Sequence, residues 1–272
     1  MKFLQSVLAF LDASMEQPQP YGWFHLLFFA LSFLTLIPLL RFSRKPTDDH
    51  IRRVVFVTAV IVTVLEVYKQ INYSFSYENG IAFDYQWYAF PFQFCSTPMY
   101  IGLLAGIFKK GKVHESLCAY LATYALFAGL SVMVYPTTVF ISTIGINLQT
   151  MICHGSMITI GIYLFATGYV PLKQKTVLKA MPVFAVTVAM AAIMNEVAYQ
   201  AGLLETETFN MFFISPYCDP SLPVYSLVQQ FVPFPWCLVL YILGFTAAAY
   251  LVLLVAMAVS ALLKKKQSAA VA

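Results

Sequence analysis

The chain has 272 residues, of which 60% are hydrophobic and only 10% are charged, against roughly 25% charged residues in an ordinary soluble domain. This composition excludes an unstructured polar chain, a basic nucleic-acid-binding domain and an ordinary water-soluble globule. Lipid must therefore be the solvent over much of the chain. The five cysteines show no C-x-x-C pair and no zinc-ligand spacing, so we predict neither a disulfide scaffold nor a metal site.

Seven apolar stretches are long enough to cross a bilayer, because a spanning helix needs about 20 mainly apolar residues. We therefore predict an all-α polytopic membrane protein, a bundle of seven transmembrane helices. A short outer interfacial segment (1–21) precedes the transmembrane domain (22–263), and a basic cytoplasmic tail (264–272) follows it. The predicted spans are 22–40, 54–72, 89–108, 116–134, 147–168, 180–202 and 234–263.

The basic residues fall almost entirely on one side of these spans. Only Lys2 lies on the opposite side, and Lys69 lies within a span. Because loops rich in lysine and arginine stay in the cytoplasm, we predict an outer amino terminus and a cytoplasmic carboxyl terminus. The other 14 of the 16 basic residues are Arg41, Arg44, Lys45, Arg52, Arg53, Lys109, Lys110, Lys112, Lys173, Lys175, Lys179, Lys264, Lys265 and Lys266.

Two outer segments accompany the bundle. The apolar run at the start of the chain is short and is followed by Asp12 and Glu16. Its apolar residues recur on one helical face, which indicates an interfacial helix rather than a signal peptide. The outer segment 203–233 can cap a site at the outer end of the bundle. It contains Cys218, and a disulfide with Cys237 is left open by the sequence.

Ionisable or reactive residues in four predicted spans lie at one depth. Glu66, Cys95, His154 and Glu196 are each six or seven residues from the outer end of their span. At 1.5 Å per residue, that distance is roughly 9–10 Å. Since such groups are costly in lipid and usually face the bundle interior, this layer predicts a functional site in the outer leaflet.

Cys95 and His154 together have the residue types of a nucleophile and its base. A thiolate is the reactive form of cysteine, and a neutral imidazole is a suitable group to generate it. The alternatives are a cysteine that packs as a small hydrophobe and a histidine with a structural hydrogen bond. Pro98 follows Cys95 closely and is expected to kink the predicted helix, which frees backbone groups for a ligand.

Further polar residues of the spans are candidates for substrate contacts or for orienting the reactive pair. Glu66 and Lys69 are three residues apart, so they can also form a neutralising pair that fixes a helix interface. For the others, hydrogen bonding between helices is the alternative. These candidates are Gln93, Ser96, Asn147, Asn195, Glu196, Tyr199, Glu66 and Lys69.

Four segments carry a family resemblance: FQFCSTPMY (92–100), LFAGLSVMVYP (126–136), FISTIGINLQTMICHG (140–155) and FNMFFISPY (209–217). Over residues 85–250 the chain resembles the bacterial YwaF-type integral membrane proteins. It is similar, more distantly, to animal transmembrane protein 164, a cysteine-dependent acyltransferase that acts on lipids. The resemblance implies that Cys95 is the nucleophile and His154 its partner, and that the protein resides in a bacterial cytoplasmic membrane.

Two functions follow as hypotheses. In the first, His154 deprotonates Cys95, which attacks an ester of an outer-leaflet lipid, so that the protein is a lipid acyltransferase or ester hydrolase. Gln93, Ser96 or free backbone N–H groups near Pro98 would stabilise the oxyanion. The second is a small-molecule or ion-coupled transporter or a lipid-binding module, suggested by intramembrane charges and the proline break. Both imply membrane lipids as partners, without a cofactor or nucleic acid, and leave the oligomeric state open.

Overall fold

The computed structural model describes residues 2–43, 46–77, 80–136, 139–219, 222–234 and 236–271. Arg44 and Lys45 of the predicted basic loop lie outside these described residues. The helices are α1 (Lys2–Leu11), α2 (Trp23–Leu34), α3 (Leu36–Phe42), α4 (Asp48–Asn72), α5 (Thr97–Ile107), α6 (Lys112–Tyr120), α7 (Leu126–Val134), α8 (Ile144–Ala166), α9 (Lys175–Gln200), α10 (Pro223–Phe231) and α11 (Trp236–Val271). Short elements are β1 (Phe75–Ser76), β2 (Ala82–Phe83), η1 (Trp87–Ala89), η2 (Leu121–Ala125), η3 (Leu203–Glu205) and η4 (Met211–Phe213).

Six helical units in the described residues are long and apolar enough to cross a membrane. Two of them are composite, since α2 and α3 follow each other directly and η2 joins α6 to α7. The helical membrane architecture is therefore confirmed, with six candidate spans in place of seven. The six units are Trp23–Phe42, Asp48–Asn72, Lys112–Val134, Ile144–Ala166, Lys175–Gln200 and Trp236–Lys266.

The predicted span 89–108 is not one continuous helix. Only α5 is α-helical there, and its 11 residues extend about 16 Å, too little to cross about 30 Å of hydrocarbon. Pro98 does not kink a helix but stands in the first turn of α5, where its missing N–H costs no helix hydrogen bond. The segment 91–96 before it is irregular, so Cys95 lies in a non-helical stretch beside the helix end.

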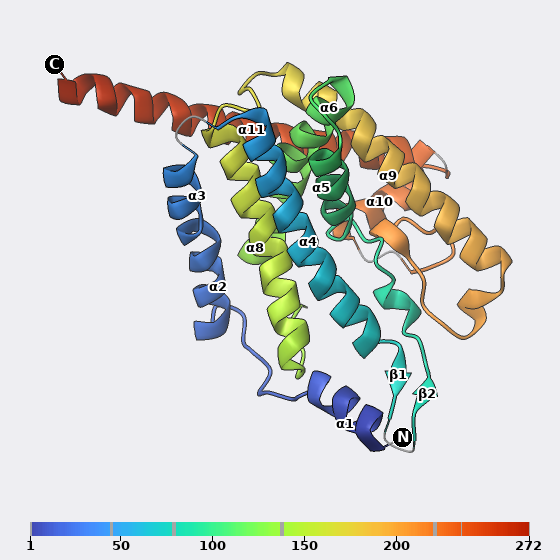
Figure 1. The fold of residues 1–272 in the computed structure, drawn as a ribbon. Helices are drawn as coiled ribbons and strands as arrows, with labels where there is room; N and C mark the ends of the chain where they lie inside the picture. The colour runs from blue at the N-terminus through green and yellow to red at the C-terminus, as the bar shows by residue number, and fades with distance from the viewer. Residues whose placement is uncertain are drawn as a thin grey trace.

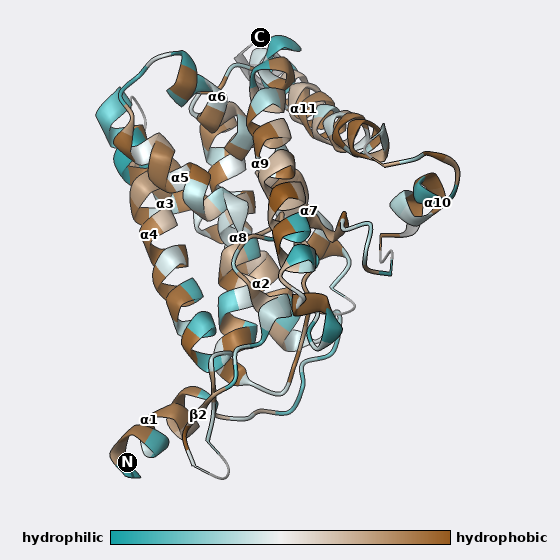
Figure 2. Cartoon of the chain, turned by 90° about the vertical axis from the view of Figure 1, so that its right-hand side faces the viewer, coloured by the Kyte–Doolittle hydropathy of each residue, from teal (hydrophilic) through white to brown (hydrophobic). Residues whose placement is uncertain are grey.

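The bundle is organised around α8. This helix is buried through most of its length and packs against α2, α4 and α7, while α4 also packs against α5 (Figure 1). A second group forms where α9 packs against α6 and α11. The end of α11 projects past the bundle (Figure 1). Figure 2 shows long helices that are mostly hydrophobic, with hydrophilic residues gathered at the connections and toward the end of α4.

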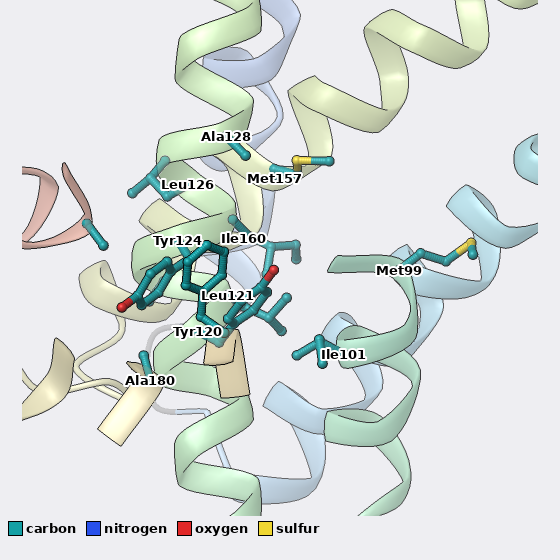
Figure 3. Packing of buried hydrophobic residues seen from close by; sticks show 14 of the residues in the cluster. Met99, Ile101, Tyr120, Leu121, Tyr124, Leu126, Ala128, Met157, Ile160 and Ala180 are labelled. Atoms are coloured by element: carbon teal, nitrogen blue, oxygen red, sulfur yellow. The ribbon is translucent and has the colours of Figure 1, made fainter. Parts of the chain in front are cut away.

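The core contains a π-helical turn that the sequence pattern does not predict. Within the α6–α7 unit, η2 carries a π-helix, and the residues around it are almost completely buried. Tyr120 and Tyr124 stack with ring centroids 5.6 Å apart (Figure 3). Their hydroxyls bond Thr97 at 2.8 Å and Thr246 at 2.7 Å. The wider turn thus connects α5 and α11 through two buried tyrosines.

The end of the bundle predicted to lie outside carries α1 and the β1–β2 hairpin (Figure 1). The helix predicted near the amino terminus is confirmed as α1, and its Phe3 and Phe10 side chains are exposed. All five cysteines are free, so Cys218 and Cys237 are not joined. Cys218 instead donates to the Phe209 carbonyl, and Cys237 contacts the Tyr225 hydroxyl.

Candidate functional site

A buried carboxylate at the interface of α4 and α8 is the centre of a polar network. Glu66 is 5% exposed, and its Oε1 lies 2.8 Å from Lys69 Nζ. Gln70 donates to the same oxygen at 2.8 Å, and Gln149 of α8 donates to Oε2 at 3.0 Å. Both carboxylate oxygens therefore have partners, as a buried charge requires.

The network continues from Gln70 toward the hairpin. Gln70 Nε2 also donates to the Ala89 carbonyl at 2.9 Å, and its Oε1 accepts from the Tyr85 hydroxyl at 2.6 Å. Burial and the negative charge of Glu66 raise the pKa of Tyr85 to about 12. This phenol thus stays protonated and remains a donor at neutral pH.

Cys95 is positioned by the irregular segment that leads into α5. The backbone N–H groups of Ser96 and Thr97 both donate to the Gln93 carbonyl, at 2.9 and 3.1 Å. Ser96 is the residue before α5, so the thiol lies one residue ahead of the helix cap. From α8, Cys153 Sγ contacts the Cys95 carbonyl oxygen at 3.8 Å, which brings this segment against the helix that carries His154.

His154 is buried, and only one of its ring nitrogens has a partner. Nδ1 lies 2.7 Å from the Thr150 carbonyl one turn earlier on α8. Because a carbonyl only accepts, Nδ1 carries the proton, so in the neutral imidazole Nε2 carries the lone pair. In the described part of the chain, Nε2 makes no hydrogen bond. The ring is thus held in the tautomer that a general base needs.

Cys95 and His154 lie on elements that touch, but no hydrogen bond joins their side chains in the described residues, since His154 Nε2 has no partner. The ammonium of Lys69 interacts electrostatically with both of them. The Ser96 side chain interacts with the thiol. The structure therefore gathers Glu66, Lys69, Cys95, Ser96 and His154 where α4, α8 and the segment 91–96 meet.

Gln93 and Asn195 use their amides to hold the strained loop around η4. Gln93 donates to the Asn210 carbonyl and accepts from the Phe212 N–H. Asn195 donates to the Met211 carbonyl at 3.0 Å and accepts from its N–H at 2.7 Å. Phe212 and the next residue have positive φ angles of 57° and 56°, a conformation that costs bulky residues about 1–3 kcal/mol each. These amides hold the loop, so the structure supports the alternative of structural hydrogen bonding.

Three other predicted residues lie apart from this cluster. Asn147 accepts from the Ile141 N–H and donates to its carbonyl, which fixes the turn before α8. Glu196 is exposed and accepts from the Tyr217 hydroxyl at 2.7 Å, a bond that raises the pKa of Tyr217. Tyr199 stacks on Tyr217 with ring centroids 3.6 Å apart. Shared depth on separate helices did not bring Glu196 to the cluster, because its side chain faces away from the interior.

A cleft of about 360 Å³ reaches the polar network from the surface between α4 and α5. Glu66 and Gln70 lie in its wall, and Pro91 and Met99 line it on either side of Cys95 in the chain. The remaining wall is largely apolar. The cleft thus has the mixed character of a site for an amphipathic molecule. Its other lining residues are Thr63, Val67, Ile71, Ser74, Phe75, Phe83 and Tyr100.

Four residues contact the members of the cluster but were not among the predicted site residues: Gln70, Gln149, Thr150 and Cys153. Helical spacing places Gln70 one turn after Glu66, and Thr150 one turn before His154, so both had a detectable signal. Gln149 and Cys153 become relevant only because α8 packs beside α4 and the segment 91–96.

Within the described residues, no group of three or more His, Cys, Asp or Glu side chains could hold a metal ion.

Comparison with known proteins places the chain in a family. The model of the TMEM164 family matches residues 17–257, which include the polar cluster, and the chain belongs to that family. No curated protein and no solved structure matches the chain significantly. The match supports a relation to TMEM164 and a multi-pass membrane protein.

Proposed function

We propose that this member of the TMEM164 family is a membrane-embedded thiol enzyme that transfers an acyl chain from a lipid ester through an acyl-thioester. Acceptors would be a second lipid, a lipoprotein amine or water, the last giving ester hydrolysis. One observation carries the proposal: among the described residues the buried Nε2 of His154 has no partner, and the helix that carries it contacts the Cys95 segment. An orphaned buried acceptor is costly for a structural histidine, whereas a general base needs its lone pair free.

In the proposed reaction, Cys95 Sγ transfers its proton to His154 Nε2 and forms a bond to the ester carbonyl carbon. The tetrahedral intermediate then expels the lipid alkoxide, which takes the proton from His154. The acceptor repeats these steps on the thioester and regenerates the thiol. Because catalytic hydrogen bonds are often open until substrate binds, the unjoined Cys95 and His154 would meet in the substrate complex.

Two features near the thiol would stabilise the negative charge that develops on the sulfur or on the ester oxygen during the reaction. The amino-terminal end of α5 directly follows Ser96, and the positive end of a helix dipole favours a thiolate or an oxyanion. The Ser96 hydroxyl is a further donor. Gln93 is a weaker oxyanion candidate than the sequence indicates, because both of its amide atoms already bond the loop around η4.

The cleft beside Glu66 is the proposed entrance for the substrate. Its apolar wall would take an acyl chain, while the Ser74 hydroxyl would meet the polar part of the lipid near the membrane boundary. If the amino terminus lies outside, as the basic loops predict, the proposed reaction would take place in the outer leaflet of a bacterial cytoplasmic membrane. The transport alternative has less support, because both Glu66 oxygens are already bonded.

Acyl labelling tests this proposal directly. Purified protein in lipid is given a phospholipid with an alkyne-tagged acyl chain, and hydroxylamine-sensitive label is measured. We expect label on the wild type, none on Cys95→Ala, and a rate lower by about 10²–10⁴ for His154→Gln, since that is the usual contribution of a general base. Cys118→Ala removes a buried thiol that contacts His114 rather than the Cys95 segment, so it is the matched control and should retain label. Absence of label from folded wild type, or label that survives in Cys95→Ala, would refute the proposed nucleophile.

A further inference from the structure

A second and larger cleft lies on the other side of α5, between α5, α6 and α9. Its volume is about 740 Å³, within the range of sites that bind small molecules. It does not include Glu66, Cys95 or His154 and shares only Tyr100 with the cleft beside Glu66. The proposed acyl transfer therefore leaves it without a role.

The wall of this cleft is apolar and lies at membrane depth. Along α9 it runs from Pro182 to Met194, which is about 18 Å at 1.5 Å per residue. Since α9 is a candidate span, hydrocarbon surrounds this stretch, and an apolar chain is the occupant that such surroundings supply. The apolar lining includes Ile101, Leu104, Leu117, Val183, Val186 and Met190.

Polar groups gather at one end of the cleft, on the first turns of α6. Lys112 and Ser116 both line it and are four residues apart, so they share a helix face. Lys112 is exposed, and the described residues place no carboxylate within 4.0 Å of its ammonium. By contrast, Lys110 and Lys179 nearby are paired with Asp48 and Glu115.

We propose that this cleft binds one anionic phospholipid from the leaflet at the basic end of the bundle. Lys112 and Ser116 would bind the headgroup phosphate, and one acyl chain would lie along α9 toward Met194. Basic residues between helices at the cytoplasmic side are the usual partners of anionic headgroups, and the basic loops predict that this end is cytoplasmic. The site does not depend on acyl transfer at Cys95, so either proposal can fail alone.

Native mass spectrometry of the full chain tests the site. The protein is released from mixed micelles with equal amounts of phosphatidylglycerol and phosphatidylcholine carrying the same chains, and the retained lipid is counted. We expect preferential retention of phosphatidylglycerol. Lys112→Gln should lower the preference about fivefold, the effect of one lysine at an anionic lipid surface. Lys109→Gln removes an equal charge outside the cleft and should leave the preference within about twofold.

A second pair of variants tests whether the cleft binds the acyl chain of the lipid. Val186→Trp fills the cleft and should lower retention of both lipids, whereas Ile193→Trp, on the same helix outside the lining, should not. Elution volume and helicity verify folding. Equal retention of the two lipids, equal effects of Lys112→Gln and Lys109→Gln, or unchanged retention by Val186→Trp would each overturn the proposal.

Discussion

The Glu66–Lys69 pair allows a sharp test of how the polar cluster is held together. The two charged groups are 2.8 Å apart with side chains 6% and 16% exposed. At an effective dielectric constant of about 20, their attraction is about 6 kcal/mol, which the loss of hydration largely offsets. The net value of the pair is therefore small, but the loss of one partner leaves an uncompensated buried charge.

We expect Glu66→Gln and Lys69→Met each to lower the free energy of unfolding by about 3–5 kcal/mol. In the double variant no charge is left alone. The amide oxygen introduced by Glu66→Gln can accept from Gln70, and its N–H group can donate to the Gln149 oxygen once the Gln149 amide turns over. The cost of the double variant should be well below the sum of the two single costs, by about 3 kcal/mol or more. Denaturant titration in micelles, followed by circular dichroism, measures this double-mutant cycle.

The same variants distinguish a structural pair from a chemical one. If the pair only fixes the interface of α4 and α8, the folded double variant should retain acyl labelling within about threefold. Additive single effects below about 1 kcal/mol would refute the reasoning, because they would show that water screens the pair. A stable double variant without labelling would instead assign a chemical role to the two charges.

Three further measurements address the packing around the cluster. Asn195→Leu removes two hydrogen bonds to one buried backbone unit of η4, so we expect a loss of about 2–6 kcal/mol and faster proteolysis of the loop around η4; wild-type resistance would contradict this role. Gly129→Ala would place a Cβ 2.7 Å from the carbonyl oxygen of His154 and should cost about 1–3 kcal/mol and slow labelling, whereas Gly244→Ala meets no atom within 4 Å and should be neutral or slightly stabilising. Thiol titration of the unreduced, denatured protein should count five thiols; a count of three would indicate a Cys218–Cys237 disulfide.

Local sequence patterns predicted part of the candidate site. Charged groups in apolar helices must find partners, so Glu66 and Lys69 were identifiable as a pair from their spacing, and the short contact between them confirms that pairing. The depth of Cys95 and His154 also identified residues that the fold brings onto touching elements. Depth alone did not distinguish inward from outward faces, which is why Glu196 was included although its side chain is exposed.

The role of Pro98 shows where a local rule was insufficient. Proline disrupts a helix interior but fits a first helical turn, and both outcomes agree with an apolar stretch of span length. Hydrogen bonds between distant segments decided between a kinked long helix and a short helix that begins near Pro98. Gln93 and Asn195 hold the η4 loop from two sides, and that loop packs against the irregular segment with Cys95. The bonds from Gln93 join residues more than 100 positions apart and have no local signature.

By itself, the sequence determined the solvent and the element type, because about 20 apolar residues in lipid must satisfy their backbone groups within a helix. It also determined which residues were costly to bury and so needed partners. Only the tertiary structure decided that six units have spanning length, that Cys95 precedes a short helix, and that His154 keeps one nitrogen without a partner, all within the described part of the chain. Those outcomes depend on which helix faces meet, and packing over the whole chain sets that choice.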